Sequence, residues 1–231
     1  MTLVGFSLNQ TLRLLAEGSL VDLAFEKGEF TAIVGPSGCG KTTLLNMIGG
    51  LDQPTSGSVK IEGVDITNMR SGKLVDFRLH NIGFIFQSYN LIPFLTVKEN
   101  VEFIMELQHR DRREINDRVD YLLEAMGIAD KKNVRPKYLS GGQQQQVAVA
   151  RVLASKPKFI LADEPTANLD SKSTDTLLDL MASLNKKEQV TFIFSTHDQR
   201  VMDKAHRIIT LEEGKVINDL KLTSSHEKIS I

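Results

Sequence analysis

The sequence predicts an α/β fold with a mostly parallel sheet, an antiparallel β subdomain and an inserted helical subdomain. Short apolar runs rich in Ile, Val and Phe alternate along the chain with longer stretches of helical periodicity. Each run is bounded by polar residues and leads toward a helical stretch, which is typical of parallel sheets with helices on their faces. The buried strands are predicted at residues 30–34, 82–86, 159–162 and 190–194.

Additional strands are expected at residues 2–8, 20–26 and 58–62, and we predict that they pair antiparallel. The turn residues Thr55, Ser56 and Gly57 stand directly before the last of them. The middle of the chain is more helical, so residues 90–155 are interpreted as a lobe inserted between two strands of the sheet.

One helix of this lobe has a clear apolar face over residues 113–126. Gly127 then offers a C-terminal stop, and the charges of residues 110–120 are interpreted as the solvated side of the helix. The polar tail at residues 223–231 is expected to be frayed. The apolar face of the helix at residues 113–126 comprises Ile115, Val119, Leu122, Leu123 and Met126. Residues 1–231 as a whole are interpreted as one domain.

Composition and charge exclude several classes of protein. The chain has 231 residues, 41% hydrophobic and 25% charged, with a formal net charge of −1. No block of basic residues is present, so we expect no nucleic-acid partner. The single cysteine, Cys39, cannot form an internal disulfide, which fits a reducing cytosol. Neither a secretion signal nor a run of about 20 apolar residues is evident, so any membrane role must come through a partner.

A phosphate-binding loop is the strongest local signal. It fits G-x-x-x-x-G-K-[ST], follows a predicted strand and precedes a helical run that begins with Thr43. Glycines let backbone N–H groups surround a phosphate chain, Lys41 can charge-pair with the outer phosphates, and the Thr42 hydroxyl can ligate Mg²⁺. The alternative is a glycine-rich turn with a chance Lys-Thr. The motif predicts a P-loop NTPase core that binds ATP. It comprises Gly35, Pro36, Ser37, Gly38, Cys39, Gly40, Lys41 and Thr42.

Two adjacent acids end the apolar run at residues 159–162. A buried strand that delivers a carboxylate to its C-terminal end matches the place where open α/β sheets bind ligands. Asp163 is therefore predicted to bind Mg²⁺, and Glu164 to polarise a water for attack on the γ-phosphate. The alternative, a strand end that meets solvent, is common for isolated acid pairs and much weaker downstream of a phosphate loop.

A second anion-binding segment lies at residues 139–143, the signature segment. Ser140 is a natural N-cap, and Gly141 and Gly142 allow close backbone approach at the start of a helix that Gln143 continues. One chain has no evident need of two phosphate surfaces on one nucleotide, whereas two chains placed head to tail do. A composite, two-fold dimer is therefore predicted, as a homodimer or with a related ATPase. A plain helix cap is the alternative interpretation.

These three motifs, in this order, resemble the ABC ATPase superfamily over nearly the whole chain. Within this superfamily, the sequence resembles the group of stand-alone ATPase subunits that includes those of lipoprotein-release, macrolide-export and cell-division complexes. The similar segments are the glutamines after the signature glycines and residues 161–166, 82–87 and 90–93.

The resemblance implies roles for three further residues. Gln87 matches a glutamine that senses Mg²⁺ and the attacking water and begins the segment that touches the membrane partner. His197 matches a switch histidine that contacts the γ-phosphate. Asp170 belongs to a bridging loop, residues 167–170, that would help orient the attacking machinery across the dimer interface. Without the resemblance, Gln87 and His197 would be read as structural residues at strand ends.

Two positions depart from the family pattern. No tyrosine stands near the N-terminus to stack on adenine; Phe6 is nearest, and Leu8 is the other candidate for that position. Gln146 stands where an arginine usually follows the glutamines. Neither change removes a group that the phosphate chemistry needs.

The sequence thus predicts an ATP-hydrolysing subunit at the cytoplasmic face of the cell membrane that powers an integral membrane permease. ATP would close the dimer, and hydrolysis would reopen it. The alternative is an ATPase that relays force or signal without transporting a substrate. A chromosome-type ATPase would carry a long coiled coil, which is absent, and a translation factor of the superfamily would carry two such domains.

Overall fold

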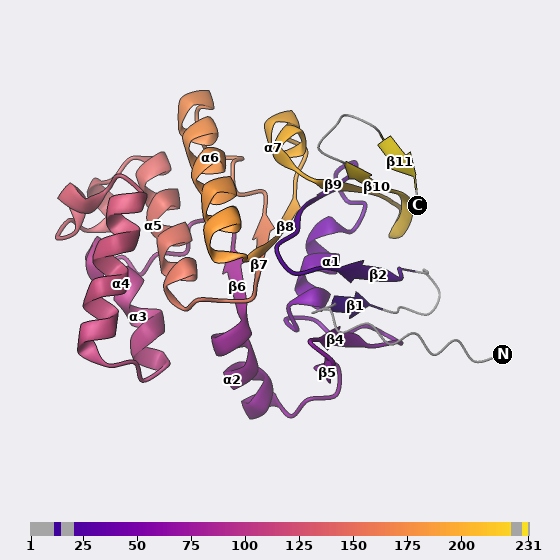
Figure 1. Ribbon diagram of the computed structural model, residues 1–231, viewed down its shortest axis with the longest axis horizontal. Coiled ribbons are helices and arrows are strands. Elements are labelled where there is room, and N and C mark those ends of the chain that lie inside the picture. Colours follow the sequence, from indigo (N-terminus) through magenta and orange to yellow (C-terminus); the bar gives the residue numbers. More distant parts are fainter. Residues whose placement is uncertain (1–11, 15–20, 223–227, 231) are drawn as a thin grey trace.

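The computed structural model describes residues 12–14, 21–222 and 228–230 (Figure 1). Over these residues the main sheet has seven strands in the order β11-β10-β9-β3-β8-β7-β6. The strands β6, β7, β8, β3 and β9 run parallel, which confirms the predicted parallel core. They span β3 (Phe30–Val34), β6 (Ile82–Ile85), β7 (Phe159–Asp163), β8 (Thr191–Ser195) and β9 (Arg207–Glu212).

A smaller antiparallel sheet, in the order β2-β1-β4-β5, lies beside the main one. It confirms the strands predicted within residues 20–26 and 58–62, whereas residues 2–8 lie outside the described part of the chain. The strand at residues 12–14 was missed, because three residues are too few to show a period of two. The bounds are β1 (Leu12–Leu14), β2 (Leu23–Phe25), β4 (Val59–Ile61) and β5 (Val64–Asp65).

Helices cover both faces of the main sheet and divide the core in two. Along β7, Phe159 and Leu161 pack with the helix α1 (Lys41–Ile48), whereas Ile160 and Ala162 face the other side. This alternation follows from the period of two of a strand. The opposite face is covered by α5 (Gly141–Ala154), α6 (Ser171–Glu188) and α7 (Gln199–Lys204).

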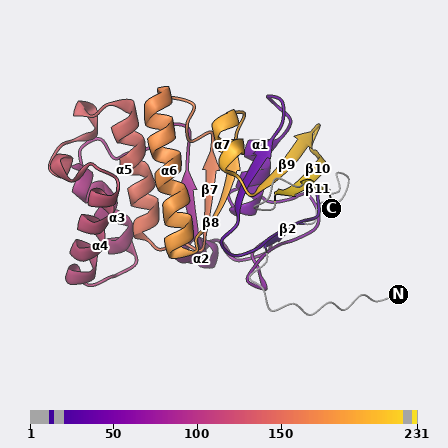
Figure 2. The same cartoon turned by 45° about the horizontal axis from the view of Figure 1, so that its top comes forward.

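The helices between β6 and β7 gather at one end of the molecule, with α6 beside them (Figures 1 and 2). The predicted apolar face is buried, and Gly127 follows α4 with φ +67°, as expected for a C-terminal stop. The chain here forms α3 (Val97–Leu107), α4 (Arg112–Ala125), two short 3₁₀ turns (Ala129–Lys131 and Pro136–Tyr138) and α5; α2 (Ser71–Asn81) leads into β6.

The C-terminal tail differs from the prediction. A frayed end was expected from Thr223, but β11 (Lys228–Ser230) pairs antiparallel with β10 (Lys215–Leu222). β10 would otherwise be an edge strand with unpaired backbone groups, and a returning segment can satisfy them. Three paired residues leave too short a pattern to be recognised in the sequence.

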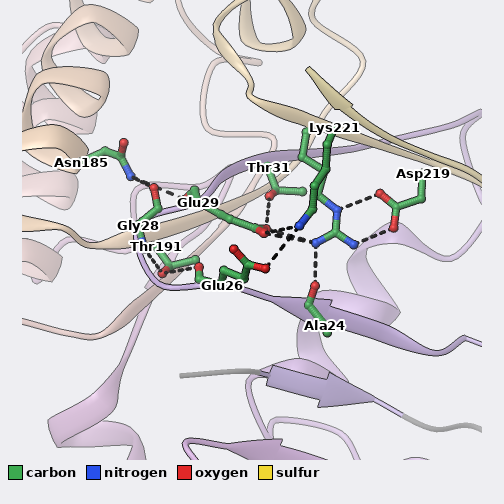
Figure 3. A network of polar contacts seen from close by, with 10 residues as sticks. Ala24, Glu26, Gly28, Glu29, Thr31, Asn185, Thr191, Asp219 and Lys221 are labelled. Atoms are coloured by element: carbon green, nitrogen blue, oxygen red, sulfur yellow. Dashed lines mark hydrogen bonds and ion pairs between the residues drawn. The ribbon is translucent and has the colours of Figure 1, made fainter. Parts of the chain in front are cut away.

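A buried arginine joins the two sheets. Arg207, at the start of β9, donates bidentate hydrogen bonds to Asp219 of β10 at 2.6 and 2.7 Å and lies 3.1 Å from a Glu29 carboxylate oxygen. It also donates to the backbone carbonyl of Ala24 in β2, and its guanidinium lies 5.3 Å from the ring centre of Phe25. Figure 3 shows Glu29, Asp219 and Ala24 converging from three strands or their ends. The side chain of Arg207 is only 7% exposed, so this network is an internal tie.

Candidate nucleotide site

The phosphate loop joins β3 to α1 and wraps around the lysine that follows it. The Nζ atom of Lys41 donates to the carbonyls of Gly35 at 2.8 Å and Pro36 at 3.1 Å. The tip of the loop, at residues 36–38, is exposed, as are Thr42 and Thr43 in the first turn of α1. An ammonium group and the N–H groups of a helix start therefore lie together at an exposed loop, an arrangement that can receive an anion.

The hairpin formed by β9 and β10 packs against the phosphate loop. Gly214, in the turn between β9 and β10, donates its N–H to the Cys39 carbonyl at 3.0 Å. A Cβ added to Gly35 would lie 2.1 Å from the Leu211 carbonyl oxygen and 2.8 Å from the Cys39 sulfur. Glycine at position 35 is therefore required by close packing. Cys39 itself is buried.

Two side chains with oxygen atoms meet at the carboxyl end of the sheet. The Thr42 hydroxyl lies 3.0 Å from both carboxylate oxygens of Asp163, the last residue of β7. Among the described residues no group of three or more His, Cys, Asp or Glu side chains could hold a metal. One hydroxyl and one carboxylate fit Mg²⁺ well, since this ion keeps several waters and takes phosphate oxygens as its other ligands.

Glu164 turns away from Asp163 because its backbone is left-handed. Its φ is +46°, and its N–H donates to the Ser195 carbonyl at 2.9 Å. One carboxylate oxygen lies 2.8 Å from Nδ1 of His197, while the other is buried and has no hydrogen-bond partner in the described chain. A buried carboxylate oxygen without a partner marks a position that a water or a ligand can complete, and a carboxylate so placed can accept a proton from that water.

Side-chain hydrogen bonds hold Asp198, the residue that follows His197. Asp198 caps α7 and accepts hydrogen bonds from the Arg200 guanidinium at 2.8 Å and from the Thr166 hydroxyl at 3.2 Å. The hydrogen bond from the Arg200 side chain lowers the pKa of Asp198, although burial opposes the shift. The hydrogen bond from Thr166 to Asp198 links the segment that carries His197 to the turn that carries Glu164.

The signature segment forms the predicted helix cap. The Ser140 hydroxyl accepts from the Gln143 N–H at 3.3 Å, and the Gln143 side chain accepts from the Ser140 N–H at 3.0 Å, which is a complete capping box. A Cβ on Gly142 would lie 2.9 Å from the Ser173 hydroxyl. Gln146 lines a cavity of about 250 Å³ next to this cap.

Gln87 and Asp170 have contacts that the sequence analysis did not predict. The backbone carbonyl of Gln87, two residues beyond β6, accepts from the Asn168 amide at 3.0 Å. Asp170 caps α6 through hydrogen bonds from the Ser173 N–H at 3.0 Å and hydroxyl at 2.6 Å, and these bonds lower its pKa. The structure brings Asn168 to Gln87 although 81 positions separate them.

Sequence reasoning also missed Gln145. Its side chain is buried and donates to the Pro165 carbonyl at 2.8 Å, which ties α5 to the turn after Glu164. A signal was present, because Gln145 lies four and seven positions before Val149 and Val152, on the buried stripe of the helix.

Comparison with known proteins decides the family. The ABC transporter family matches residues 19–167. The chain belongs to the ABC transporter family. The uncharacterized ABC transporter ATP-binding protein YvrO of Bacillus subtilis is 43% identical over 89% of this chain and 90% of that protein. The lipoprotein-releasing system ATP-binding protein LolD 1 of Chlorobium chlorochromatii is 45% identical over 87% and 82%.

A solved structure agrees with this assignment. The dimeric, post-hydrolysis ATP-binding cassette MJ0796 of Methanocaldococcus jannaschii, bound to ADP and Pi, is 39% identical. It covers 94% of this chain and 98% of its own, with a TM-score of 0.82. The chain is thus an ATPase with the ABC cassette fold and the ATP-binding subunit of a transporter complex. No helix in the described ranges is long and apolar enough to cross a membrane.

Proposed function

We propose that two copies of this chain, or one copy and a related ATPase, enclose two ATP molecules and drive a membrane permease by closing and reopening. The dimeric MJ0796 cassette supports this arrangement, as does the presence of two capped or glycine-rich helix starts in one chain. α1 and α5 pack on opposite faces of the main sheet, so each is suited to a different nucleotide. ATP would favour the closed state because it binds both surfaces there.

One observation carries the hydrolytic role: the partly buried Glu164 has one oxygen on His197 and a second, buried oxygen free. We assign Glu164 as the general base that orients the attacking water, and His197 as the group that holds it and contacts the γ-phosphate. Gln87 would add a ligand to the water or the metal.

The phosphate loop would hold the nucleotide. Lys41 would exchange its loop carbonyls for the outer phosphates, and Thr42 with Asp163 would hold Mg²⁺. The bound ion would supply charge neutralisation of the phosphate oxygens. Ser140 and its segment would close on the nucleotide of the partner subunit, and Asp170 would lie near the same interface.

The permease would dock beside the loop of residues 87–96, here called loop 87–96. A largely apolar cavity of about 390 Å³ lies next to it between α2, β6, α3 and α5. Val75 and Phe103 line it and are 53% and 38% exposed, and Phe94 of the loop is 70% exposed. Exposed apolar surface of this kind marks an interaction site. The complex would place this subunit on the cytoplasmic face of the membrane.

Glu164→Gln tests the proposal. The variant should bind Mg·ATP, lose turnover and accumulate as a dimer in sedimentation-velocity runs, because binding groups are kept and the base is removed. Wild-type protein with ADP serves as the monomer reference. A variant that hydrolyses ATP at the wild-type rate, or that stays monomeric with Mg·ATP, would contradict the assignment.

A further inference from the structure

Residues 89–92 of loop 87–96 are hydrogen-bonded to the helices α3 and α5. Arg151 of α5 donates to the backbone carbonyls of Asn90 at 2.7 Å and Tyr89 at 3.2 Å. The buried Asn100 of α3 accepts from the Ile92 N–H at 2.8 Å and donates to the Ile92 carbonyl at 3.1 Å. These contacts tie residues 89–92 to α3 and α5.

Gln87, at the start of the same loop, is held by a different segment. The Asn168 amide, in the bridging loop, donates to the Gln87 carbonyl at 3.0 Å. Gly141, in the first turn of α5, lies against both segments, since an added Cβ would be 2.8 Å from the Tyr89 hydroxyl and 3.5 Å from the Asn168 carbonyl. The signature segment, the bridging loop and loop 87–96 therefore meet at one junction.

We propose that Asn168 is a positioning residue that transmits dimer closure from the bridging loop to loop 87–96 through its hydrogen bond to the Gln87 carbonyl. This inference rests on the proposed function, because it needs a bridging loop that is displaced when two chains close. Asn168 lies in the bridging loop two residues before Asp170, the N-cap of α6, so a shift of this loop moves Asn168 with it. Gln87 stands between this contact and the helical anchors, and its carbonyl receives the displacement.

Two substitutions at position 168 test whether this hydrogen bond matters. Asn168→Asp keeps the shape but replaces the N–H donor by an acceptor, which then faces the Gln87 carbonyl. Asn168→His restores a donor nitrogen at the same distance along the side chain. Asn168 is exposed, so neither change alters the core. Asn218→Asp, on the exposed face of β10, introduces the same charge away from the junction.

The experiment is hydrogen–deuterium exchange by mass spectrometry in the stalled Glu164→Gln parent, with and without Mg·ATP. In the parent, ATP should slow exchange in peptides covering residues 35–43, 139–146 and 87–96. Asn168→Asp should keep the first two effects and lose the third. Asn168→His and Asn218→Asp should behave like the parent.

The outcomes separate the two proposals. A parent that remains monomeric with ATP refutes the proposed function, whatever position 168 does. If the parent dimerises and Asn168→Asp keeps full ATP-dependent protection at residues 87–96, the coupling role of Asn168 is wrong. A variant that loses protection in all three peptides also overturns it, since Asn168 would then support the dimer itself.

Discussion

Removing Arg207 should destabilise the chain more than removing any exposed cation. Its guanidinium, 7% exposed, satisfies Glu29 and Asp219, whose side chains are 13% and 20% exposed. Burial lowers the pKa of Arg207, but the hydrogen bonds to Asp219 and the charge of Glu29 outweigh it and raise the pKa overall. Arg207→Ala would remove the bidentate donor of Asp219 and the donor of the Ala24 carbonyl. Among the described residues, it would leave Glu29 with only the Thr31 hydroxyl and the more distant Lys221.

The magnitude follows from this burial. Taking one partner from a buried ion pair costs about 3–5 kcal/mol, since the remaining charge is left uncompensated. In a chain of this size each kcal/mol lowers the melting temperature by about 2–4 °C, so the expected drop is about 6–20 °C. The matched control is Lys221→Ala, which also removes a cation facing Glu29. Lys221 is 41% exposed and 3.7 Å away, so its loss should cost about 0–1 kcal/mol.

Differential scanning calorimetry of both variants, without nucleotide and with saturating Mg·ATP, provides the assay. A folded Arg207→Ala protein should still gain thermal stability on ATP binding, because no phosphate contact is removed. If Arg207→Ala and Lys221→Ala melt within about 2 °C of each other, less than one kcal/mol separates them. The internal tie between the two sheets would then be energetically unimportant, and the reasoning from burial would fail.

Three further predictions concern the nucleotide site. Lys41→Ala should bind ATP weakly in equilibrium dialysis, because the loop loses its ammonium group. Unchanged affinity would contradict the proposal that this loop binds the phosphates of ATP. Gly35→Ala should weaken ATP binding and stability together, since its Cβ would clash with the Leu211 carbonyl oxygen 2.1 Å away, and normal values for both would refute the packing argument. Asp198 has a lowered pKa in the folded state, so its stabilising effect is present above its unfolded pKa of about 3.9 and is lost as the pH falls through the folded value. In urea titrations Asp198→Asn should therefore be less stable than wild type at pH 7, and the gap should narrow toward pH 2.

Much of the site was predictable because its motifs are local. The order of strand, glycine loop and lysine fixes where Lys41 lies, and the run ending at Asp163 fixes a carboxylate at the sheet edge. The capping box at Ser140 likewise depends on residues three apart. Backbone geometry within one turn or strand end decides such features, so the sequence contains them directly.

Long-range partners were not predictable in the same way. Nothing near Asn168 indicates the Gln87 carbonyl, and nothing near Arg207 indicates Glu29 or Ala24. The sequence missed β1 and expected a frayed tail where β11 pairs, because each pairs over only two or three residues and depends on which strand edge is free. Such contacts follow from the packing of distant segments.

The sequence by itself determined the motifs of this protein: the glycine loop that ends in Lys41, the adjacent Asp163 and Glu164, and the capped helix start at Ser140. Only the tertiary structure decided how these groups are held. It turned Glu164 onto His197 through a left-handed backbone, and it joined the bridging loop to loop 87–96 through Asn168. The reason is physical: residue type and local spacing set which atoms a segment can offer, whereas the partner that each atom meets depends on packing between segments far apart in the chain.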